Sequence, residues 1–216
     1  MGKFLMEHES KELLEQANIP TTGCSVAKTP DEAIELAKSI GFPVALKILS
    51  PDIVHKSDIG GVKLGVGDEG ELKKAYGEIM ENAEKVSKNI VGIGVQRMAD
   101  SGVEIIVGMT KDPQFGPALM FGLGGVFVEI LKDVSFRIVP IEDRDADEMI
   151  KEIKGYPLLQ GYRGTDPVDM GKVKDLLMNV SKFVLDHPEI DELDLNPVFA
   201  YKDSVLVADA RVITSD

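Results

Sequence analysis

The sequence has 216 residues and is 44% hydrophobic, which is enough to bury one substantial core or two modest ones and argues against disorder. Its formal net charge of -13, with no dense Lys/Arg run, argues against nucleic-acid binding. The apolar run at 116–131 is broken by glycines and is shorter than the ~20 residues of a membrane span, and the single Cys24 allows no intrachain disulfide. We therefore expect no membrane association and a reducing, cytoplasmic location.

Helical and strand patterns alternate along the whole chain. One of the clearest helix signals is Thr29 as N-cap, Pro30 in the first turn and a stop at Gly41. In chain order the patterns predict helices at 10–17, 30–40, 68–88, 143–153 and 169–185, and strands at 24–27, 43–49, 62–66, 90–98, 103–110, 117–121, 126–131, 134–141, 192–201 and 204–212. Several strands are hairpin-like neighbours, so an α+β or mixed α/β fold is expected rather than a regular parallel sheet.

Two phosphate-binding motifs are disfavoured by their residues. Gly171-Lys172 is followed by Val173, which lacks the hydroxyl that a phosphate loop needs for magnesium. The segment 65–70 matches GxGxxG, but Asp68 would place a negative charge against a pyrophosphate. A turn in which Asp68 caps the next helix is the preferred interpretation.

The segment 47–61 is denser in functional residue types than a connector needs. Lys47 lies inside an apolar strand, where a lysine must reach solvent or find a partner. It is either a strand-edge lysine or a ligand of a nucleotide phosphate, with the paired glycines Gly60 and Gly61 letting backbone approach the polyphosphate.

His55 likewise has a structural and a functional interpretation. As one of three histidines it could simply be an exposed loop residue. Beside Lys56 and Asp58 in a glycine-bounded loop it could instead accept a phosphoryl group, because neutral imidazole is a nucleophile near pH 7. The other two, His8 and His187, are expected at solvated helix termini.

Carboxylate and amide oxygens gather near the C-terminus. Asp194 and Asn196 are two residues apart and so share one face of a strand, and Asp209 belongs to the following segment, which we expect to be adjacent. Magnesium takes oxygen ligands and usually only one or two from protein, so Asn196 and Asp209 could be that pair. Polar hairpin residues facing solvent are the alternative.

The motifs described above, in their order along the chain, resemble those of the ATP-grasp β subunit of ADP-forming acetyl-CoA (acyl-CoA) synthetases and, more distantly, those of succinyl-CoA synthetase β chains. The resemblance covers essentially all 216 residues and is most specific at HKSDIGGV and at DLNP followed by Asp209. The residues that carry it are Ile19-Pro20, Lys47, HKSDIGGVKLGV at 55–66, Glu104, the glycines at 122–125, QGYRG at 160–164, DLNP at 194–197 and Asp209.

The resemblance implies an ATP-grasp fold with two subdomains. The smaller, lid-like one would span 21–92, and the larger one, which binds nucleotide and magnesium, would combine 1–20 with 93–216. The implied reaction is acyl-CoA + ADP + phosphate giving acid + CoA + ATP, through an acyl phosphate and phosphohistidine carriers. An α subunit with the CoA-binding and acyl-transfer domains is the implied partner, which makes the assembly a hetero-oligomer.

The same resemblance implies roles for single residues. His55 would pass phosphate to ADP, and Asp194 would orient the visiting phosphohistidine, although succinyl-CoA relatives carry Glu there and the shorter Asp alters that contact. Asn196 and Asp209 would hold Mg²⁺. The residues implied to bind ATP or ADP are Lys47, Lys56, Gly60, Gly61, Gln96, Arg97, Met98 and Glu104.

Two positions and two rival functions stay open. The glycines at 122–125 could shape a nucleotide cleft or form a tight strand connection. Arg163 could bind phosphate or pair with Asp166. The rival functions are an ATP-grasp carboxylate ligase without phosphohistidine and a non-catalytic nucleotide-sensing subunit, and ATP and GTP are both open as nucleotides.

Overall fold

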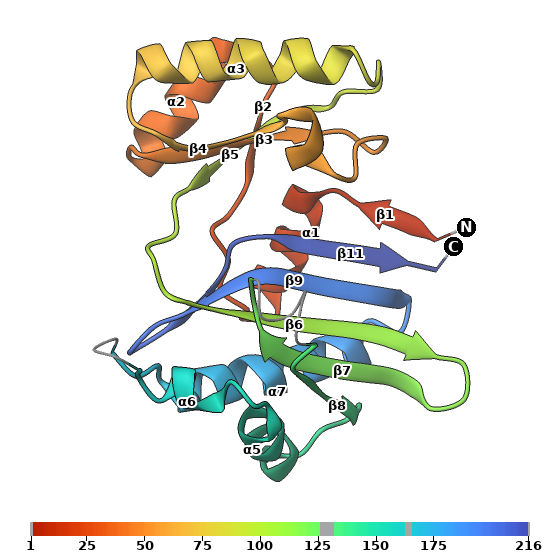
Figure 1. Cartoon of the computed structure of the whole chain (residues 1–216). Helices are drawn as coiled ribbons and strands as arrows, with labels where there is room; N and C mark the ends of the chain where they lie inside the picture. The colour runs from red at the N-terminus through yellow and green to blue at the C-terminus, as the bar shows by residue number, and fades with distance from the viewer. Residues whose placement is uncertain (1, 126–131, 163–165, 216) are drawn as a thin grey trace. The chain divides into compact units, whose positions relative to one another are not determined.

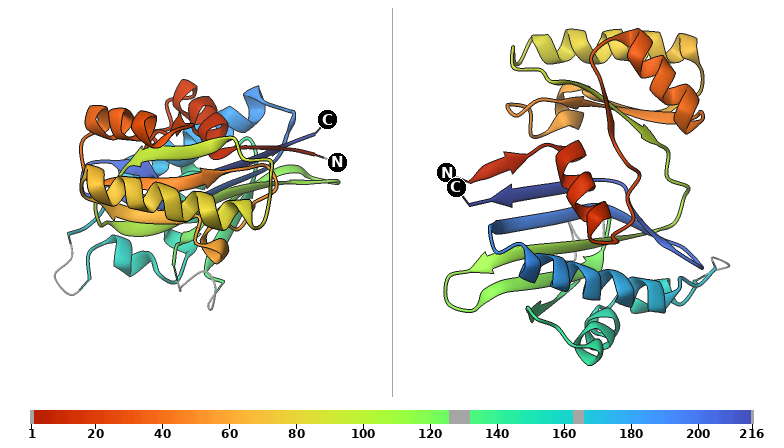
Figure 2. Two further views of the ribbon diagram at one scale, coloured as in Figure 1. Left: turned by 90° about the horizontal axis from the view of Figure 1, so that it is seen from above. Right: turned by 180° about the vertical axis from the view of Figure 1, so that it is seen from behind.

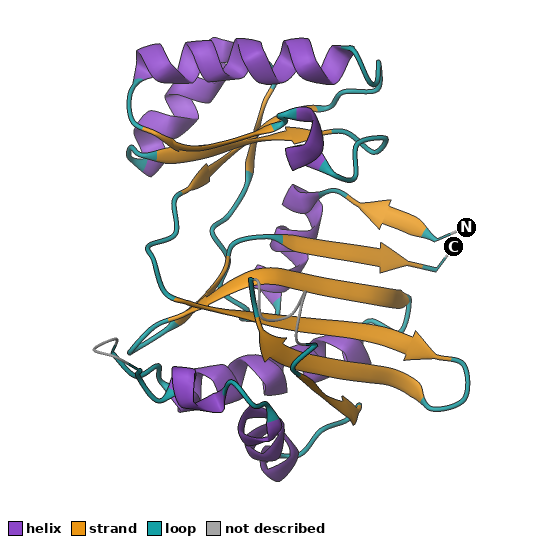
Figure 3. Ribbon diagram, in the orientation of Figure 1, coloured by secondary structure: helices purple, strands orange, loops and turns teal. Residues whose placement is uncertain are grey.

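The chain forms two antiparallel sheets, each with its own helices (Figure 3). The computed structural model describes residues 2–125, 132–162 and 166–215. The chain divides into unit 1, made of Met1–Leu5, Leu13–Thr21 and Ala99–Asp216, and unit 2, made of Met6–Glu12 and Thr22–Met98. The mixture of antiparallel sheets and helices confirms the α+β prediction.

Unit 1 is built on a seven-stranded sheet with the order β1-β11-β9-β6-β7-β8, in which β10 also pairs with β9. Its neighbouring strands run antiparallel, and the first and last of them in sequence, β1 and β11, lie side by side (Figure 1). The strands are β1 (Lys3–Leu5), β6 (Val103–Asp112), β7 (Gly116–Leu123), β8 (Val134–Ile138), β9 (Ile190–Ala200), β10 (Val205–Val207) and β11 (Ala210–Thr214).

Helices cover one face of this sheet. They are α5 (Asp143–Glu152), the short α6 (Tyr156–Leu159) and α7 (Met170–Asp186), and α5 and α7 can be seen against the sheet from behind in Figure 2. Their buried side chains, with Leu14 from the end of α1 (Glu7–Gln16), form one core with alternate residues of the strands. Burial of each of these aliphatic side chains stabilises the folded state by roughly 1.5–3 kcal/mol. This face of the sheet therefore belongs to the hydrophobic core and is not available to a ligand.

Unit 2 has a four-stranded antiparallel sheet with the order β2-β5-β3-β4 and its own core. The long helices α2 and α3 lie on the same side of this sheet (Figure 1). Its elements are β2 (Ser25–Ala27), α2 (Pro30–Ile40), β3 (Val44–Leu49), the 3-10 helix η1 (Lys56–Ile59), β4 (Val62–Val66), α3 (Glu69–Glu84) and β5 (Gly92–Arg97).

The bounds of unit 2 differ from the range 21–92 expected for the smaller subdomain. They extend to Met98 because β5 belongs to this sheet, and they include Met6–Glu12 from the start of α1. A lid-like role for this part of the chain stays a prediction.

Both helix starts predicted in unit 2 are confirmed. The Thr29 side chain accepts a hydrogen bond from the Glu32 amide at 3.2 Å, and α2 ends at Gly41 with a φ of 95°. Asp68 accepts a hydrogen bond from the Glu71 amide at 2.8 Å and so caps α3. This cap confirms the preferred interpretation of the segment 65–70.

The structure corrects the predicted elements in a few places. The strand expected at 204–212 is two strands, β10 and β11, with Asp209 between them. Strand β1 and helix α6 have sequences too short to give a periodic signal. The strand expected at 126–131 lies outside the described residues. Among those that are described, no helix has the length and apolar character needed to cross a membrane.

Candidate functional site

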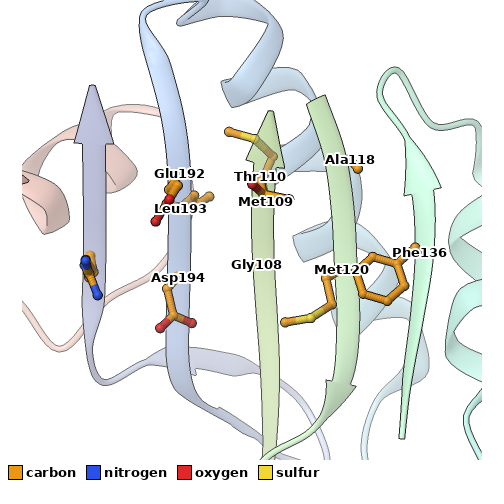
Figure 4. Close-up of a pocket in the computed structure, with 10 residues that line it drawn as sticks. Gly108, Met109, Thr110, Ala118, Met120, Phe136, Glu192, Leu193 and Asp194 are labelled. Atoms are coloured by element: carbon orange, nitrogen blue, oxygen red, sulfur yellow. The ribbon is translucent and has the colours of Figure 1, made fainter. Parts of the chain in front are cut away.

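A row of five residues crosses the sheet of unit 1. Asp194 of β9 lies opposite Arg211 of β11 on one side and opposite Gly108 of β6 on the other. From Gly108 the row continues to Met120 of β7 and Phe136 of β8. Figure 4 shows the middle and apolar end of this row, with Asp194, Gly108, Met120 and Phe136 at one level of the sheet. A charged pair therefore stands at one end and two large apolar side chains at the other.

This row faces away from the core. Successive strand residues point to opposite faces, and the chain neighbours Val107, Leu193 and Phe121 are buried in the core. The row consequently lies on the sheet face opposite α5 and α7.

The row lines a hollow of about 420 Å³. The hollow exists because Gly108 has no side chain and Ala118 a small one, whereas a methyl group at Gly108 would come within 3.1 Å of the Met120 Cε atom. At the apolar end of the hollow, Phe136 is 51% exposed. The residues that line the hollow are Gly108, Met109, Thr110, Ala118, Met120, Phe136, Glu192, Leu193, Asp194 and Arg211.

Asp194 is the titratable group in the hollow whose pKa shifts. Partial removal of the Asp194 carboxylate from water raises its pKa, and the positive charge of Arg211 lowers it. The carboxylates of Asp209 and Glu192 raise it further, so the net shift of the Asp194 pKa is upward. The side chain is solvent-exposed by surface area, so the shift reflects its place in a hollow rather than full burial. Arg211 is itself placed by Phe4, whose ring centre is 5.5 Å from the guanidinium carbon.

The predicted magnesium ligands come together beside this row. The Asn196 amide donates to the Asp209 carbonyl oxygen at 3.2 Å, and the Asp209 carboxylate accepts the Ala210 amide at 3.0 Å. The prediction that their segments are adjacent is confirmed. Asn196 is exposed on the same face of β9 as Asp194.

This donor set fits Mg²⁺ better than a softer metal. One carboxylate and one amide oxygen leave most of the coordination sphere to phosphates and water, as Mg²⁺ requires. In the ranges that the structure describes, no group of three or more His, Cys, Asp or Glu side chains could form an all-protein metal site. The assignment of Asn196 and Asp209 as ligands stays a prediction.

Glu104 lies further along the sheet, in β6, with an exposed side chain. The Gly124 amide donates to its carbonyl oxygen at 2.7 Å. A methyl group on Gly124 would come within 3.0 Å of the Glu104 Cβ atom, and one on Gly125 within 3.2 Å of its carboxylate. Close approach to Glu104 therefore accounts for glycine at 124, whereas at 125 the φ of 63° favours glycine. Arg163 lies outside the described residues.

In unit 2, three lysines converge on one buried carboxylate. The Glu7 side chain, at the start of α1, is 1% exposed. Its Oε1 atom lies 2.7 Å from the Lys47 ammonium and 3.0 Å from that of Lys11, and its Oε2 atom accepts a 2.5 Å bond from Lys56. Burial on its own would raise the pKa of Glu7, but the three lysines together hold it well below its ordinary value.

Gln96 completes this cluster. Its amide nitrogen donates to Glu7 at 2.7 Å, and its amide oxygen accepts the Lys11 ammonium at 2.7 Å and the Thr22 hydroxyl at 3.3 Å. The Gln96 amide nitrogen also lies 3.6 Å from the sulfur of Cys24, and burial raises the pKa of that thiol to about 11. Gln96 is thus buried within unit 2.

The other residues predicted to take part are close in sequence to members of this cluster. Arg97 is exposed at the end of β5, and the Met98 sulfur accepts the Gly65 amide at 3.3 Å. A role for 96–98 at the adenine stays a prediction. His55 precedes η1 with an exposed side chain, so it is accessible to a reaction partner.

The paired glycines close the loop after His55. Gly60 has a φ of 69°, a conformation that favours glycine, and the Gly61 amide donates to the Lys56 carbonyl oxygen at 2.8 Å. A methyl group on Gly61 would meet Ile48 at 2.7 Å. These contacts fix the loop against β3.

Sequence reasoning missed the residues that organise both sites. Glu7 and Lys11 are spaced for an ion pair on a helix, which is a signal that could have been read, but their contacts with Lys47 and Gln96 span 40 and 89 residues. Arg211 was missed because nothing in its local sequence distinguishes it from a surface arginine. His8 lies in the first turn of α1, at a helix terminus as expected, but its Nδ1 atom is buried.

Three comparisons relate the chain to known proteins. A family model described as an ATP-grasp domain matches residues 1–214. The beta subunit of the ADP-forming acetate–CoA ligase I of Pyrococcus furiosus is 50% identical over 97% of this chain and 91% of its own length. The ADP-forming acetate–CoA ligase I of Archaeoglobus fulgidus is 52% identical over 100% of this chain, which covers 32% of that longer protein.

Solved structures of acetyl-coenzyme A synthetase 1 from Ca. Korarchaeum cryptofilum match over 99% of this chain. The complex with coenzyme A and Ca-AMPCP has a TM-score of 0.96 and 50% identity and is covered to 94%. The complex with coenzyme A and Mg-AMPPCP, whose phosphohistidine segment points towards the nucleotide binding site, has a TM-score of 0.88 and 49% identity and is covered to 93%.

Proposed function

This chain belongs to the ATP-grasp family, and from that premise we propose that it is the nucleotide-binding subunit of an ADP-forming acyl-CoA synthetase. The reaction is acyl-CoA + ADP + phosphate giving acid + CoA + ATP. ATP or ADP with Mg²⁺ is the ligand, as in the relatives that hold Mg-AMPPCP and Ca-AMPCP. The observation that carries the proposal is the group of Asp194, Asn196 and Asp209 beside an open hollow.

The step assigned to this chain is phosphoryl transfer between a histidine and ADP. In the direction of ATP formation, the N–P bond of a phosphohistidine breaks as a β-phosphate oxygen of ADP forms the new P–O bond. Positioning and charge neutralisation supply most of the catalysis in such transfers. We assign the histidine on this chain to His55, whose side chain is exposed at the end of a loop fixed by Gly61.

Lysines in unit 2 supply positive charge for the phosphates. Lys47 and Lys56 carry ammonium groups that Glu7 holds at defined positions. Gly60 and Gly61 let the backbone approach the phosphates, and the remaining nucleotide contacts are assigned to Glu104 and to Gln96, Arg97 and Met98.

Oxygen ligands in unit 1 suit a metal-bound nucleotide. Asn196 and Asp209 are the proposed Mg²⁺ ligands, and the ion would neutralise phosphate charge when bound. Asp194 is the proposed acceptor for the N–H of an imidazole that enters the hollow. Two observations support this proposal: the pKa of Asp194 is raised, and Arg211 lies opposite it in the sheet. A cationic or N–H-donating group that entered the hollow would stabilise the ionised carboxylate.

We propose that the visiting histidine comes from a partner subunit. The Pyrococcus relative is named a beta subunit, and the Archaeoglobus relative is a longer single protein, so this chain corresponds to one part of a larger ligase. The partner would be an α subunit with the CoA-binding and acyl-transfer domains, in a hetero-oligomer. We place the reaction in the cytoplasm, which the single cysteine suits.

The test is reconstitution with the candidate α subunit. The two proteins are mixed with acetyl-CoA, phosphate, ADP and Mg²⁺, and ATP formation is measured for wild type, His55→Ala and the control His187→Ala. His187 is bonded to Glu189 at 3.0 Å at the end of α7, so its variant should keep activity. We expect ATP from wild type and loss of ATP formation only in His55→Ala.

Other outcomes would redirect the assignment. Full activity of His55→Ala would remove this histidine from the mechanism and favour a ligase without a phosphohistidine on this chain. Nucleotide binding by wild type without any ATP formation would favour another acyl substrate or a nucleotide-sensing subunit.

A further inference from the structure

Glu7 connects the two lysines that the proposed function assigns to phosphate. Lys47 comes from the middle of β3 and Lys56 from η1, nine residues later. Their ammonium groups bind different oxygens of the one Glu7 carboxylate, at 2.7 and 2.5 Å. The positions of the two positive charges are therefore set by a single side chain from a third element.

The carboxylate is itself firmly held. Glu7 is 1% exposed, and Lys11, one helical turn later, lies 3.0 Å from its Oε1 atom. Gln96 donates to the same oxygen at 2.7 Å and is bound in turn to Lys11. Because α1 and β5 both fix it, Glu7 acts as a rigid anchor rather than as a mobile counterion.

The three lysines differ in what they can offer a ligand. Lys11 is 1% exposed and binds Thr22, Gln96 and Glu7, which makes it part of the scaffold. The Lys47 and Lys56 side chains are 9% and 16% exposed, so they lie nearer to solvent. An ammonium group has three N–H donors, and the bond from Lys56 to Glu7 uses one of them.

We propose that Glu7 is a positioning residue for nucleotide binding, which holds the Lys47 and Lys56 ammonium groups where they meet the phosphates of the nucleotide. This inference rests on the proposed function. A free lysine side chain carries about 2 kcal/mol of rotamer entropy that ordering on a phosphate would cost. Anchoring on Glu7 places both lysines before the nucleotide arrives, so less of that entropy is lost on binding.

The first test changes the reach of the carboxylate and keeps its charge. In Glu7→Asp the negative charge remains but the carboxylate is shortened by one methylene, which withdraws it from Lys47 and Lys56. The matched control is Glu9→Asp on the same helical turn, where Glu9 accepts only the Met6 amide at 2.8 Å among the bonds described and contacts neither lysine. Isothermal titration of the full chain with ADP and Mg²⁺ gives the affinities.

We expect Glu7→Asp to weaken ADP binding by about tenfold or more, with Glu9→Asp within twofold of wild type. In the assembled enzyme, Glu7→Asp should raise the KM for ADP by more than it lowers kcat, because the lysines act on binding. A thermal melt of both variants separates this effect from unfolding.

A double-mutant cycle distinguishes positioning from a purely structural role. If Glu7 acts through Lys56, the effect of Glu7→Asp on ADP affinity should shrink severalfold in a Lys56→Gln background. Fully additive effects, or an affinity unchanged by Glu7→Asp, would overturn the inference. Should Glu7→Asp fail to fold, Lys56→Gln, which lies at the partly exposed side of the cluster, must by itself weaken ADP binding for the inference to stand.

The two proposals fail in different ways. Absence of ADP binding by wild type would overturn the proposed function together with this inference. Tight ADP binding by wild type that persists in Glu7→Asp would overturn this inference and leave the proposed function intact.

Discussion

Replacing Glu7 by Gln removes the negative charge shared by Lys11, Lys47 and Lys56 while keeping the size of the side chain. The three ammonium groups lie 2.5–3.0 Å from the carboxylate, and the pair with Lys11 is 1% exposed on both sides. Breaking a buried ion pair by removing one partner costs about 3–5 kcal/mol, because a charge is left buried without compensation. Against a total stability of about 5–15 kcal/mol, this is a large loss.

The loss should depend on pH with a defined sign. The three lysines hold the pKa of Glu7 below its ordinary value of 4.5, so its ionised form stabilises the folded state. That contribution is fully present above the ordinary pKa and disappears as the pH falls below it towards the lowered value. The difference in stability between wild type and Glu7→Gln should therefore be largest at neutral pH and shrink below about pH 4.5.

Guanidinium unfolding at pH 7 and at pH 3–4, followed by circular dichroism, measures this difference. Hydrogen exchange at β3 and β5 would show whether the loss is local to the strands that carry Lys47 and Gln96. Glu78→Gln is the matched control, since Glu78 bonds Lys63 at 2.6 Å on an exposed surface and solvent screens that pair. Equal, small losses in both variants, or a Glu7→Gln loss that grows at low pH, would refute the reasoning.

Three further changes test the other sites. Asp194→Asn should abolish most ATP formation yet leave the melting temperature unchanged or higher at pH 7. The reason is that a carboxylate with a raised pKa destabilises the folded state above its ordinary pKa. A clear fall in melting temperature would contradict this. Gly61→Ala should destabilise the folded chain by about 1–3 kcal/mol, since the added methyl group meets Ile48 at 2.7 Å. The control Gly77→Ala in α3 adds a methyl group in open space and should stabilise the chain by about 0.4–1 kcal/mol in the same denaturant assay. Asp209→Asn should raise the Mg²⁺ concentration needed for half-maximal ATP formation, and an unchanged Mg²⁺ titration would exclude it as a ligand.

Local signals in the sequence predicted much of the fold. The caps at Thr29 and Asp68 act within three residues of themselves, so the chain alone contains the information. The same holds for the adjacency of the last strands, which are separated by a short turn. The break between β10 and β11 was missed because Asp209 interrupts a run that is otherwise continuous in composition.

The sites were predicted less completely because their geometry depends on distant residues. Asp194 and Asn196 could be placed on one face from strand periodicity, but the hollow beside Asp194 depends on Gly108 and Met120, which reach it through strand order. Sequence periodicity carries no information about which strands become neighbours across a sheet. The position of Asp194 on its strand was thus predictable, and the shape around it was not.

Lys47 shows how a local oddity can indicate a distant partner. A lysine in the middle of an apolar strand requires compensation, and the structure supplies it from Glu7, 40 residues earlier. The chain has a net charge of -13, yet charges beyond about 8 Å are largely screened at physiological ionic strength. Affinity for an anionic nucleotide therefore depends on the few cations next to it. Glu7 gathers Lys47 and Lys56 into a local concentration of positive charge within an acidic protein. Under the proposed function, this is how one chain combines high net negative charge with nucleotide binding.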